Sequence, residues 1–453
     1  MNNKKIVVFL EKYLPSPFSI AFLLTLISII LAFFFTKSPE ESTFYFIDIL
    51  GFWEKGFWEL LSFTMQMSLI LLLGHVLAIS PIMKKLTSGI TQYCTSTAKA
   101  AFIISFTAIF ISYINWGMCL IIGAVFVREV GEYAIRNGIK ISYPILGAAG
   151  YSGMMTWHGG FSGSAPLVVS QPGHFLESKM GVLPISETLL SPLNIVVFLS
   201  TIIIIPAFFY LIGKKTAAKH DISEYHFLIE KTDGSKLNSN EDSDSQNLDQ
   251  KRWPALVLGL LVVLLSLIKA FESSSDSFLG FINLNYVNFL LFGLGILLHG
   301  SFKNFLKAVE NAIHGISGII IQFPLYAGIM GIMKYSGLVG VFSEAIVSIS
   351  NTHTFPLLTL FSGALVNTFV PSGGGQWAVQ GPILIEAANQ LNVSTAKTVM
   401  ALSYGDQLTN MLQPFWALPL LGITRLKAAQ IFPYSLSVLL VGALIYSSLL
   451  LIF

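Results

Sequence analysis

The chain has 453 residues, of which 54% are hydrophobic and 11% are charged, and its mean hydropathy is +0.71. A soluble domain carries roughly 25% charged residues, so the composition excludes an ordinary soluble protein. The net charge is only +2, and no basic patch interleaved with aromatic residues indicates nucleic-acid binding. Apolar runs long enough to cross about 30 Å of hydrocarbon recur, and they predict an all-α polytopic membrane protein.

The N-terminal third of the chain begins with continuous apolar segments. Residues 1–56 are predicted to form one spanning helix, 18–35, followed by a loop on the outer face. Residues 57–213 are predicted to form a first repeat, which begins and ends with the spanning segments 57–79 and 189–212.

Two apolar stretches inside this first repeat are interrupted by residues that disfavour a helix. The stretch 98–127 is interrupted by Asn-Trp-Gly, starting at Asn115, and we expect a re-entrant hairpin there. The stretch 141–169 contains the run TWHGGFSGSAP, with three glycines and a proline. We expect this second stretch to be a helix that is broken within the membrane.

A polar segment separates the two halves of the chain. Residues 214–252 are rich in Ser, Asn, Asp and Lys. Such a segment cannot bury enough apolar surface to fold alone, so we predict a mobile cytoplasmic linker. Residues 253–311 follow with two connecting spanning segments, 253–271 and 281–299.

Residues 312–453 are predicted to form the second repeat, with spanning segments at 312–333 and 428–453. The stretch 353–390 is interrupted by NTFVPSGGGQWAVQGP, and each glycine costs about 1 kcal/mol in a helix relative to alanine. We expect a second re-entrant hairpin here. The stretch 396–423 is interrupted by DQLTNMLQP and is predicted to be a second broken helix.

Matching positions in the two halves indicate an internal repeat. Asn115 and Asn367 are 252 positions apart. A spacing of 253 relates Tyr151 to Tyr404, Thr156 to Thr409 and Pro166 to Pro419. If the N-terminus lies inside, most Lys and Arg residues also lie inside, as the positive-inside rule expects. We therefore predict nine spanning segments and two hairpins in two inverted repeats, a design of secondary transporters with substrate near the midplane.

Non-helical backbone at membrane depth is tolerated only inside protein or beside a wet cavity, so we expect the four breaks to meet. A hairpin tip exposes the N-terminus of its returning helix, where N–H groups and the helix dipole favour an anion. The alternative for the glycines is close helix packing. The residues predicted to contact substrate are Asn115, Trp116, Gly117, Thr156, Trp157, His158, Asn367, Thr368, Ser372, Gly373, Gly374, Gly375, Gln376, Trp377, Gln380, Thr409, Asn410 and Gln413.

Asp406 is an acid deep inside an apolar segment, and such a carboxylate is a functional candidate by default. We expect it to couple transport to Na⁺ or H⁺, helped by Asn115 and Asn367; the alternative is a purely structural carboxylate. His158 either donates a proton to a carboxylate or is a neutral structural histidine. The tryptophans at the breaks either wall the substrate or pack inside the protein. No cofactor is expected, and no metal beyond a Na⁺ site, because the two cysteines fit no metal-ligand pattern.

Three strings carry a family resemblance: VNTFVPSGGGQWAVQGP at 366–382, GYSGMMTWHGGFSGSAPL at 150–167 and LSYGDQLTNMLQPFW at 402–416. They resemble the bacterial short-chain fatty acid transporters, the acetoacetate and butyrate uptake permeases, over essentially the whole chain. The resemblance implies transport of short-chain monocarboxylates across the bacterial inner membrane. With an ion coupled through Asp406, we expect this transport to be symport. The larger ion-transporter superfamily often uses an elevator mechanism and a dimeric scaffold, so a homodimer is implied as well.

One departure from that superfamily concerns the hairpin tips. Its dicarboxylate carriers bear Ser-Asn-Thr at both tips, whereas this chain has Asn367-Thr368 in the second hairpin and Asn115-Trp116 in the first. The departure argues against a symmetric pair of Na⁺ sites.

The sequence also leaves other functions open. No Lys or Arg lies at the predicted midplane, which favours a monocarboxylate, but a carrier of a dicarboxylate or an amino acid derivative is the alternative. A membrane-embedded hydrolase would need a nucleophile and a base, and His158 near Ser162 and Ser164 is the one candidate. A channel seldom needs paired broken hairpins. We therefore expect a carrier that works in the lipid bilayer with its N-terminus in the cytoplasm.

Overall fold

The computed structural model describes residues 17–37, 44–216, 225, 248–273, 281–368 and 372–453. All regular elements among these residues are helices, with no strand, so the predicted all-α class is confirmed. Six helices in the described ranges are long and apolar enough to cross a membrane, which makes the chain a multi-pass membrane protein. The first 16 residues and most of the predicted linker 214–252 lie outside the described residues.

The helices of the first half follow the predicted interruptions. In chain order they are α2 (Pro17–Phe35), α3 (Tyr45–Glu59), α4 (Leu61–Ala78), α5 (Pro81–Thr91), α6 (Thr97–Ile114), α7 (Trp116–Arg136), α8 (Tyr143–Tyr151), the 3₁₀ turn η1 (Ser152–Met155), α9 (Ser164–Val168), α10 (Glu177–Met180) and α11 (Pro192–Lys215).

The second half is helical as well. Its elements are η4 (Leu248–Gln250), α12 (Arg252–Ser273), α13 (Leu284–His299), α14 (Phe302–Ile313), η5 (His314–Ile316), α15 (Ser317–Ser336), α16 (Leu338–Ser348), α17 (Phe355–Asn367), α18 (Gly373–Gln390), α19 (Thr395–Thr409), η6 (Asn410–Leu412), α20 (Pro414–Thr424) and α21 (Ala428–Ile452).

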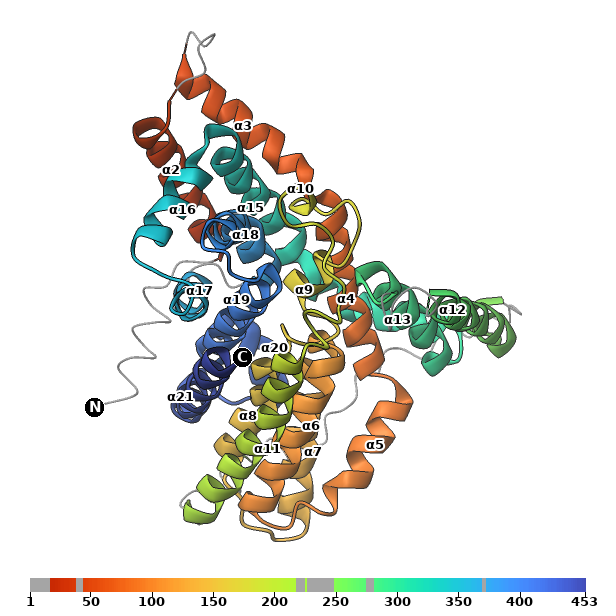
Figure 1. The fold of residues 1–453 in the computed structure, drawn as a ribbon. Coiled ribbons are helices and arrows are strands. Elements are labelled where there is room, and N and C mark those ends of the chain that lie inside the picture. The colour runs from red at the N-terminus through yellow and green to blue at the C-terminus, as the bar shows by residue number, and fades with distance from the viewer. Residues whose placement is uncertain (1–16, 38–43, 217–224, 226–247, 274–280, 369–371) are drawn as a thin grey trace.

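Helices in the two halves of the chain pack in corresponding ways. In the first half, the returning helix α7 packs on α4, and in the second half, the returning helix α18 packs on α15. The two halves also contact each other, because α20 packs on α7 and α9 packs on α18. Figure 1 shows α9, α18, α19 and α20 near the centre of the molecule, while α12 and α13 extend to one side. The inverted orientation, the domain limits and the re-entrance of the hairpins stay predictions.

Helix ends fall at each of the four predicted interruptions, and polar caps or prolines explain why. Asn115 Oδ1 accepts from the Met118 N–H to begin α7, and Ser372 Oγ accepts from the Gly375 N–H to begin α18. In the second broken helix, Pro414 starts α20, where its missing N–H is not needed. The non-helical backbone therefore arises from local sequence.

The structure corrects the predicted elements at several places. A break at Leu60 separates α3 from α4, so 57–79 is not one segment, and α3 fills part of the predicted outer loop. The short helices α5, α14 and α16 replace predicted loops, and α7 runs past the predicted limit of its hairpin. For α3 the reason is packing between small residues: α3 crosses α15 where Gly56 faces Gly331, a contact that the length of an apolar run does not reveal.

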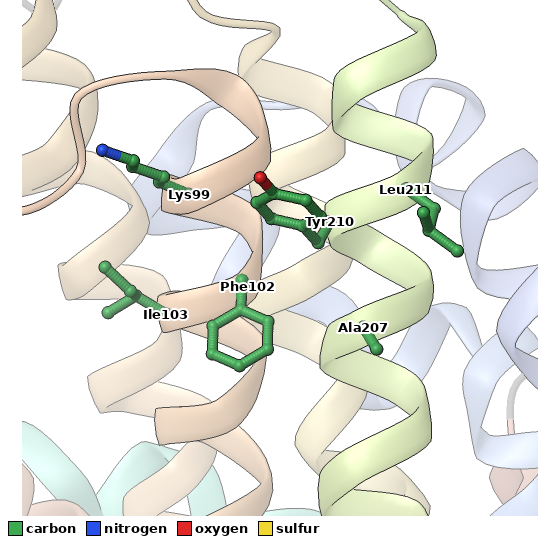
Figure 2. Close-up of a pocket in the computed structure, with 6 residues that line it drawn as sticks. All are labelled: Lys99, Phe102, Ile103, Ala207, Tyr210 and Leu211. Atoms are coloured by element: carbon green, nitrogen blue, oxygen red, sulfur yellow. The ribbon is translucent and has the colours of Figure 1, made fainter.

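An apolar groove on the side of the molecule has no part in the predicted site. It has a volume of about 500 Å³ and lies between α6 and α11 (Figure 2). Phe102 and Tyr210 meet there with ring centroids 6.5 Å apart. The lining residues are Lys99, Phe102, Ile103, Ala207, Tyr210 and Leu211. Such a face suits contact with lipid tails, and none of the predicted site residues lines it.

Candidate substrate site

A buried histidine and a buried carboxylate join the two broken helices. His158 Nδ1 lies 2.7 Å from Asp406 Oδ2, and neither side chain has exposed surface. His158 follows η1 in the first half, whereas Asp406 belongs to α19 in the second. The pair therefore links two segments that are 248 positions apart in the chain.

The other ring nitrogen of His158 fixes its tautomer. The Ala165 N–H donates to Nε2 across 3.1 Å, and Ser164 Oγ lies 2.9 Å from the same atom. A backbone N–H can only donate, so Nε2 is an acceptor and Nδ1 carries the proton. His158 is thus a neutral ring that donates to the Asp406 carboxylate.

The N-terminus of α18 lies against this pair. A methyl group on Gly373 would lie 2.6 to 2.9 Å from Trp157 Cη2, His158 Cε1 and Ser164 Oγ. The next two glycines touch aromatic rings: Gly374 meets Phe63 and Phe323, and Gly375 meets Tyr326. We call Gly373, Gly374 and Gly375 the glycine tip. Its glycines serve packing, and the same close approach places the first N–H groups of α18, which lack partners within the helix, beside His158.

The second hairpin is tied to the second broken helix by amides. Asn367 Nδ2 donates to Asp406 O, Thr409 Oγ1 and Asn410 Oδ1 over 2.8 to 3.0 Å. Gln413 Nε2 donates to the carbonyl of Asn367 across 2.8 Å and to that of Thr368 across 3.2 Å. Among the described residues, Asp406 Oδ1 and Asn367 Oδ1 meet no donor in good geometry. Two buried oxygens at this break are therefore open to a further ligand.

The first hairpin uses its polar atoms within its own half. Asn115 Oδ1 accepts from the Met118 N–H at 2.8 Å, and its Nδ2 donates to Ile70 O at 3.3 Å. The Trp116 N–H donates to Ser162 Oγ at 3.0 Å. Gly117 packs on Leu71 of α4. These contacts anchor the break and leave the Asn115 oxygen occupied.

Tryptophan rings connect the first hairpin to the first broken helix and to α20. Trp157 stacks on His158 with ring centroids 4.4 Å apart, and lies 5.6 Å from Trp116. Trp116 in turn lies 5.0 Å from Trp416 of α20. Trp377 is placed elsewhere, because its ring faces Phe175 at 6.5 Å. Of the three predicted tryptophans, Trp157 therefore contacts His158 directly and Trp116 contacts it through Trp157.

Three predicted polar residues, Thr156, Gln376 and Gln380, use their side chains in contacts away from His158. Thr156 Oγ1 donates to the carbonyls of Ile109 and Gly153 at 3.2 Å. Gln376 Nε2 donates to Gly363 O at 2.8 Å, which ties the two arms of the second hairpin together, and to Gln380 Oε1 of its own helix at 2.7 Å.

Two residues that complete the cluster, Gln407 and Tyr151, were not among the predicted site residues. Gln407 Oε1 accepts from the N–H groups of His158 and Gly159, at 3.2 and 3.3 Å. Tyr151 OH donates to Asn410 O at 2.6 Å and lies 3.1 Å from Gln413 O. Tyr151 already stood out through its repeat spacing, but the spacing gives no sign of the carbonyls that it binds.

Comparison with known proteins identifies the family. The model of the short-chain fatty acid transporter family matches residues 2–453. The chain belongs to this family. A candidate short-chain fatty acid transporter of Escherichia coli (strain K12) is 37% identical over 439 residues, covering 97% of this chain and 96% of that protein. A candidate short-chain fatty acid transporter of Haemophilus influenzae is 36% identical over 451 residues, with 98% and 97% covered.

Membership of this family decides between two classes of protein. Asp406, His158 and Ser164 have the residue types and order of contact of a hydrolase triad. The family consists of transporters, however, so the hydrolase alternative is set aside and the chain is not an enzyme. A transporter binds a small-molecule substrate and works in the lipid bilayer.

Two solved transporters share the fold. The YdaH transporter of Alcanivorax borkumensis is 13% identical, with 97% of this chain and 98% of that chain covered and a TM-score of 0.63. The Neisseria gonorrhoeae MtrF protein, from a class of antimetabolite efflux pumps, is 14% identical, with 98% and 96% covered and a TM-score of 0.58. At this identity the likeness extends to the fold alone.

Proposed function

We propose that the chain is a secondary active carrier that brings short-chain monocarboxylates, such as acetoacetate or butyrate, across the bacterial inner membrane. Its N-terminus would lie in the cytoplasm. The observation that carries the proposal is the contact of the glycine tip with the buried His158–Asp406 pair, within a transporter family. Family and site together favour a small anion as the transported substrate.

The substrate carboxylate would bind at the N-terminus of α18. Partly unpaired N–H groups and the helix dipole favour an anion there, as in other carriers with broken helices. Ser164 Oγ adds a hydroxyl beside Gly373. The described ion pair of Asp406 is with His158 alone, so no Lys or Arg pairs with the buried carboxylate. A site of this kind suits one carboxylate better than two.

Asp406 is our candidate for coupling. A buried carboxylate without a cation is costly, and a proton or Na⁺ would remove the cost. The open oxygens Asp406 Oδ1 and Asn367 Oδ1 fit Na⁺, because unwound segments in carriers coordinate this ion with oxygen atoms. Asp406 Oδ1 equally fits a proton. Asn115 adds less, because its oxygen already caps α7.

Uptake in proteoliposomes tests the proposal. Labelled acetoacetate and butyrate are supplied with a Na⁺ gradient or a pH gradient imposed separately. We expect saturable accumulation under at least one gradient, and competition by monocarboxylates stronger than by dicarboxylates or amino acid conjugates. Stronger competition by a dicarboxylate would favour the alternative substrate class. Conductive flux that does not saturate would instead identify a channel.

Transport would proceed by elevator-like movement, in which the hairpins and broken helices carry the substrate past a fixed scaffold, often a dimer in the superfamily. The contacts between the two halves, of α20 with α7 and of α9 with α18, support movement of these elements as one body. Cross-linking of cysteine pairs between α18 and α4, trapped in two states, would measure this movement.

A further inference from the structure

A polar cavity of about 440 Å³ opens where α3 meets α4. Four segments enclose it: the junction of α3 and α4, the chain after α9, the start of α13 and the end of α15. We call it the α3–α4 cavity. Ligand pockets of about 300 to 1,000 Å³ are typical for small molecules, so a short-chain acid and several waters fit inside.

The lining combines amide side chains with one lysine. Gln66 Nε2 donates to Gln171 Oε1 at 3.0 Å and to Asn285 Oδ1 at 2.8 Å, so amides from three segments meet. Lys334 Nζ lies 3.1 Å from Glu59 Oε2, and Tyr335 OH also donates to Glu59. In the described lining, Lys334 and Glu59 therefore offset each other, and an arriving anion meets no net negative charge.

A histidine in the lining adds no charge near neutral pH. His174 Nε2 donates to Gly181 O at 2.9 Å, and its Nδ1 accepts from the Leu176 N–H. Burial lowers the pKa of His174 below its ordinary value. The ring is therefore neutral, and the charge of the cavity depends on Lys334 and Glu59.

Phe63 forms part of the cavity wall and also covers the glycine tip. Phe63 lines the cavity, and a methyl group on Gly374 would lie 2.8 Å from its Cζ. Phe323 completes the cover, since its ring centroid lies 5.8 Å from that of Phe63 and it touches Gly374 as well. Behind the cover, His158 and Ser164 are fully buried. The cavity and the site are thus separated by two aromatic rings.

Predicted topology agrees with a role in entry. All four segments that enclose the cavity fall on the side that the positive-inside rule assigns to the exterior. We propose that the α3–α4 cavity admits the monocarboxylate from outside and that Phe63 and Phe323 form the gate between the cavity and the glycine tip. This inference rests on the proposed function. Lys334 is the group that first meets the carboxylate.

Cysteine labelling tests the entrance directly, because the two natural cysteines are buried and the unmodified chain serves as the blank. Ser62→Cys places a thiol in the cavity lining at an exposed position of α4. In right-side-out membrane vesicles, a membrane-impermeant anionic thiol reagent should label this variant. Butyrate should slow the labelling, and labelling should remove most of the uptake. The matched control is Ser348→Cys, also exposed and on the same predicted side but outside the cavity. It should be labelled without protection and without loss of uptake.

Two results would contradict the proposal that the cavity is the entrance from outside. Labelling of Ser62→Cys only in inside-out vesicles would show that the cavity faces the cytoplasm. Labelling that butyrate does not slow, with uptake retained, would show that the substrate does not pass through the cavity. Either can occur while unlabelled protein accumulates butyrate, so the proposed function would survive. If the unlabelled chain accumulates no acid, the proposed function fails instead, and protection of Ser62→Cys by butyrate still reports binding.

Substitutions in the lining and the gate give a second measurement. Lys334→Met should raise the KM for uptake while the maximal rate is kept, and Lys334→Arg should restore the KM. For the gate, Phe63→Ala should raise the rate at which the reagent reaches Ser164→Cys from outside, whereas Phe63→Leu should raise it less. An unchanged rate in the Phe63→Ala variant would contradict the gate.

Discussion

The two hairpin breaks are built alike and connected differently. Each returning helix begins with a polar cap, Asn115 for α7 and Ser372 for α18. After the cap, the polar atoms of the first break bind their own half, at Ile70 and Ser162, and only the Trp116 ring reaches the other half, at Trp416. The second break crosses to the other half, because its glycines touch His158, Ser164 and Phe63.

The two hairpin breaks also differ in whether their asparagine side-chain oxygens have hydrogen-bond donors. The side-chain oxygen of Asn115 caps α7, whereas that of Asn367 meets no donor among the described residues. A closed set of hydrogen bonds stabilises a scaffold, while open buried oxygens indicate a place for a ligand. We infer that the first break is mainly an anchor and the second mainly a binding surface. Substitutions at matched positions can test this difference.

The largest effect is expected at the first glycine of the tip. Gly373→Ala places a methyl group within 2.6 to 2.9 Å of three buried side-chain atoms, whereas the methyl group of Gly117→Ala lies 3.0 to 3.1 Å from Leu71. Overpacking of this kind costs about 1 to 3 kcal/mol, and at Gly373 it falls on the proposed carboxylate site. We expect Gly373→Ala to abolish butyrate uptake and Gly117→Ala to keep part of it, measured in proteoliposomes at equal protein content.

Gly422→Ala is the control for this pair, because nothing lies within 4 Å of its added methyl group. It should transport as the unmodified chain does. Equal losses at Gly373 and Gly117 would contradict the assignment of anchor and binding surface.

The next effect is on coupling. Asp406→Asn removes the negative charge of the buried side chain but keeps its size. The coupling Na⁺ or H⁺ then has no carboxylate to neutralise. We expect accumulation against a gradient to be lost while exchange of labelled for unlabelled acid stays measurable. Glu386→Gln, the same change at a partly exposed carboxylate that pairs with Lys179, should keep accumulation. Full accumulation by Asp406→Asn would show that coupling does not need this residue.

Much of the fold follows from rules that act along the chain, and this is why it could be predicted. Glycine, proline and polar caps end helices wherever they occur, so the helix ends near Asn115 and Pro414 follow from local sequence. Contacts between distant segments have no such signature. Sequence proximity made Ser162 and Ser164 equal neighbours of His158, yet only Ser164 binds the ring, and Ser162 accepts from Trp116 instead. The crossing of α3 and α15 likewise depends on two facing glycines far apart in the chain.

A smaller effect is expected from the ring that links the halves. In His158→Asn the new amide can still donate to Asp406, but Ser164 and the Ala165 N–H lose their acceptor. Leaving buried donors unpaired costs about 1 to 3 kcal/mol. We expect a raised KM for butyrate with ion coupling retained, measured as uptake against concentration under each gradient. Loss of coupling equal to that of Asp406→Asn would show that the ring itself carries the ion.

The smallest effect on transport is expected at the anchor. Asn115→Ala removes the cap of α7 and the bond to Ile70, and loss of an N-cap costs about 1 kcal/mol of stability. We expect a lower midpoint of thermal unfolding in detergent and an unchanged KM for butyrate. Asn115→Asp keeps the capping oxygen and should recover part of the stability, although it loses the donor to Ile70. If Asn115→Ala instead kept its stability and changed the ion dependence of uptake, the first break would belong to the coupling site, and the two halves would share it.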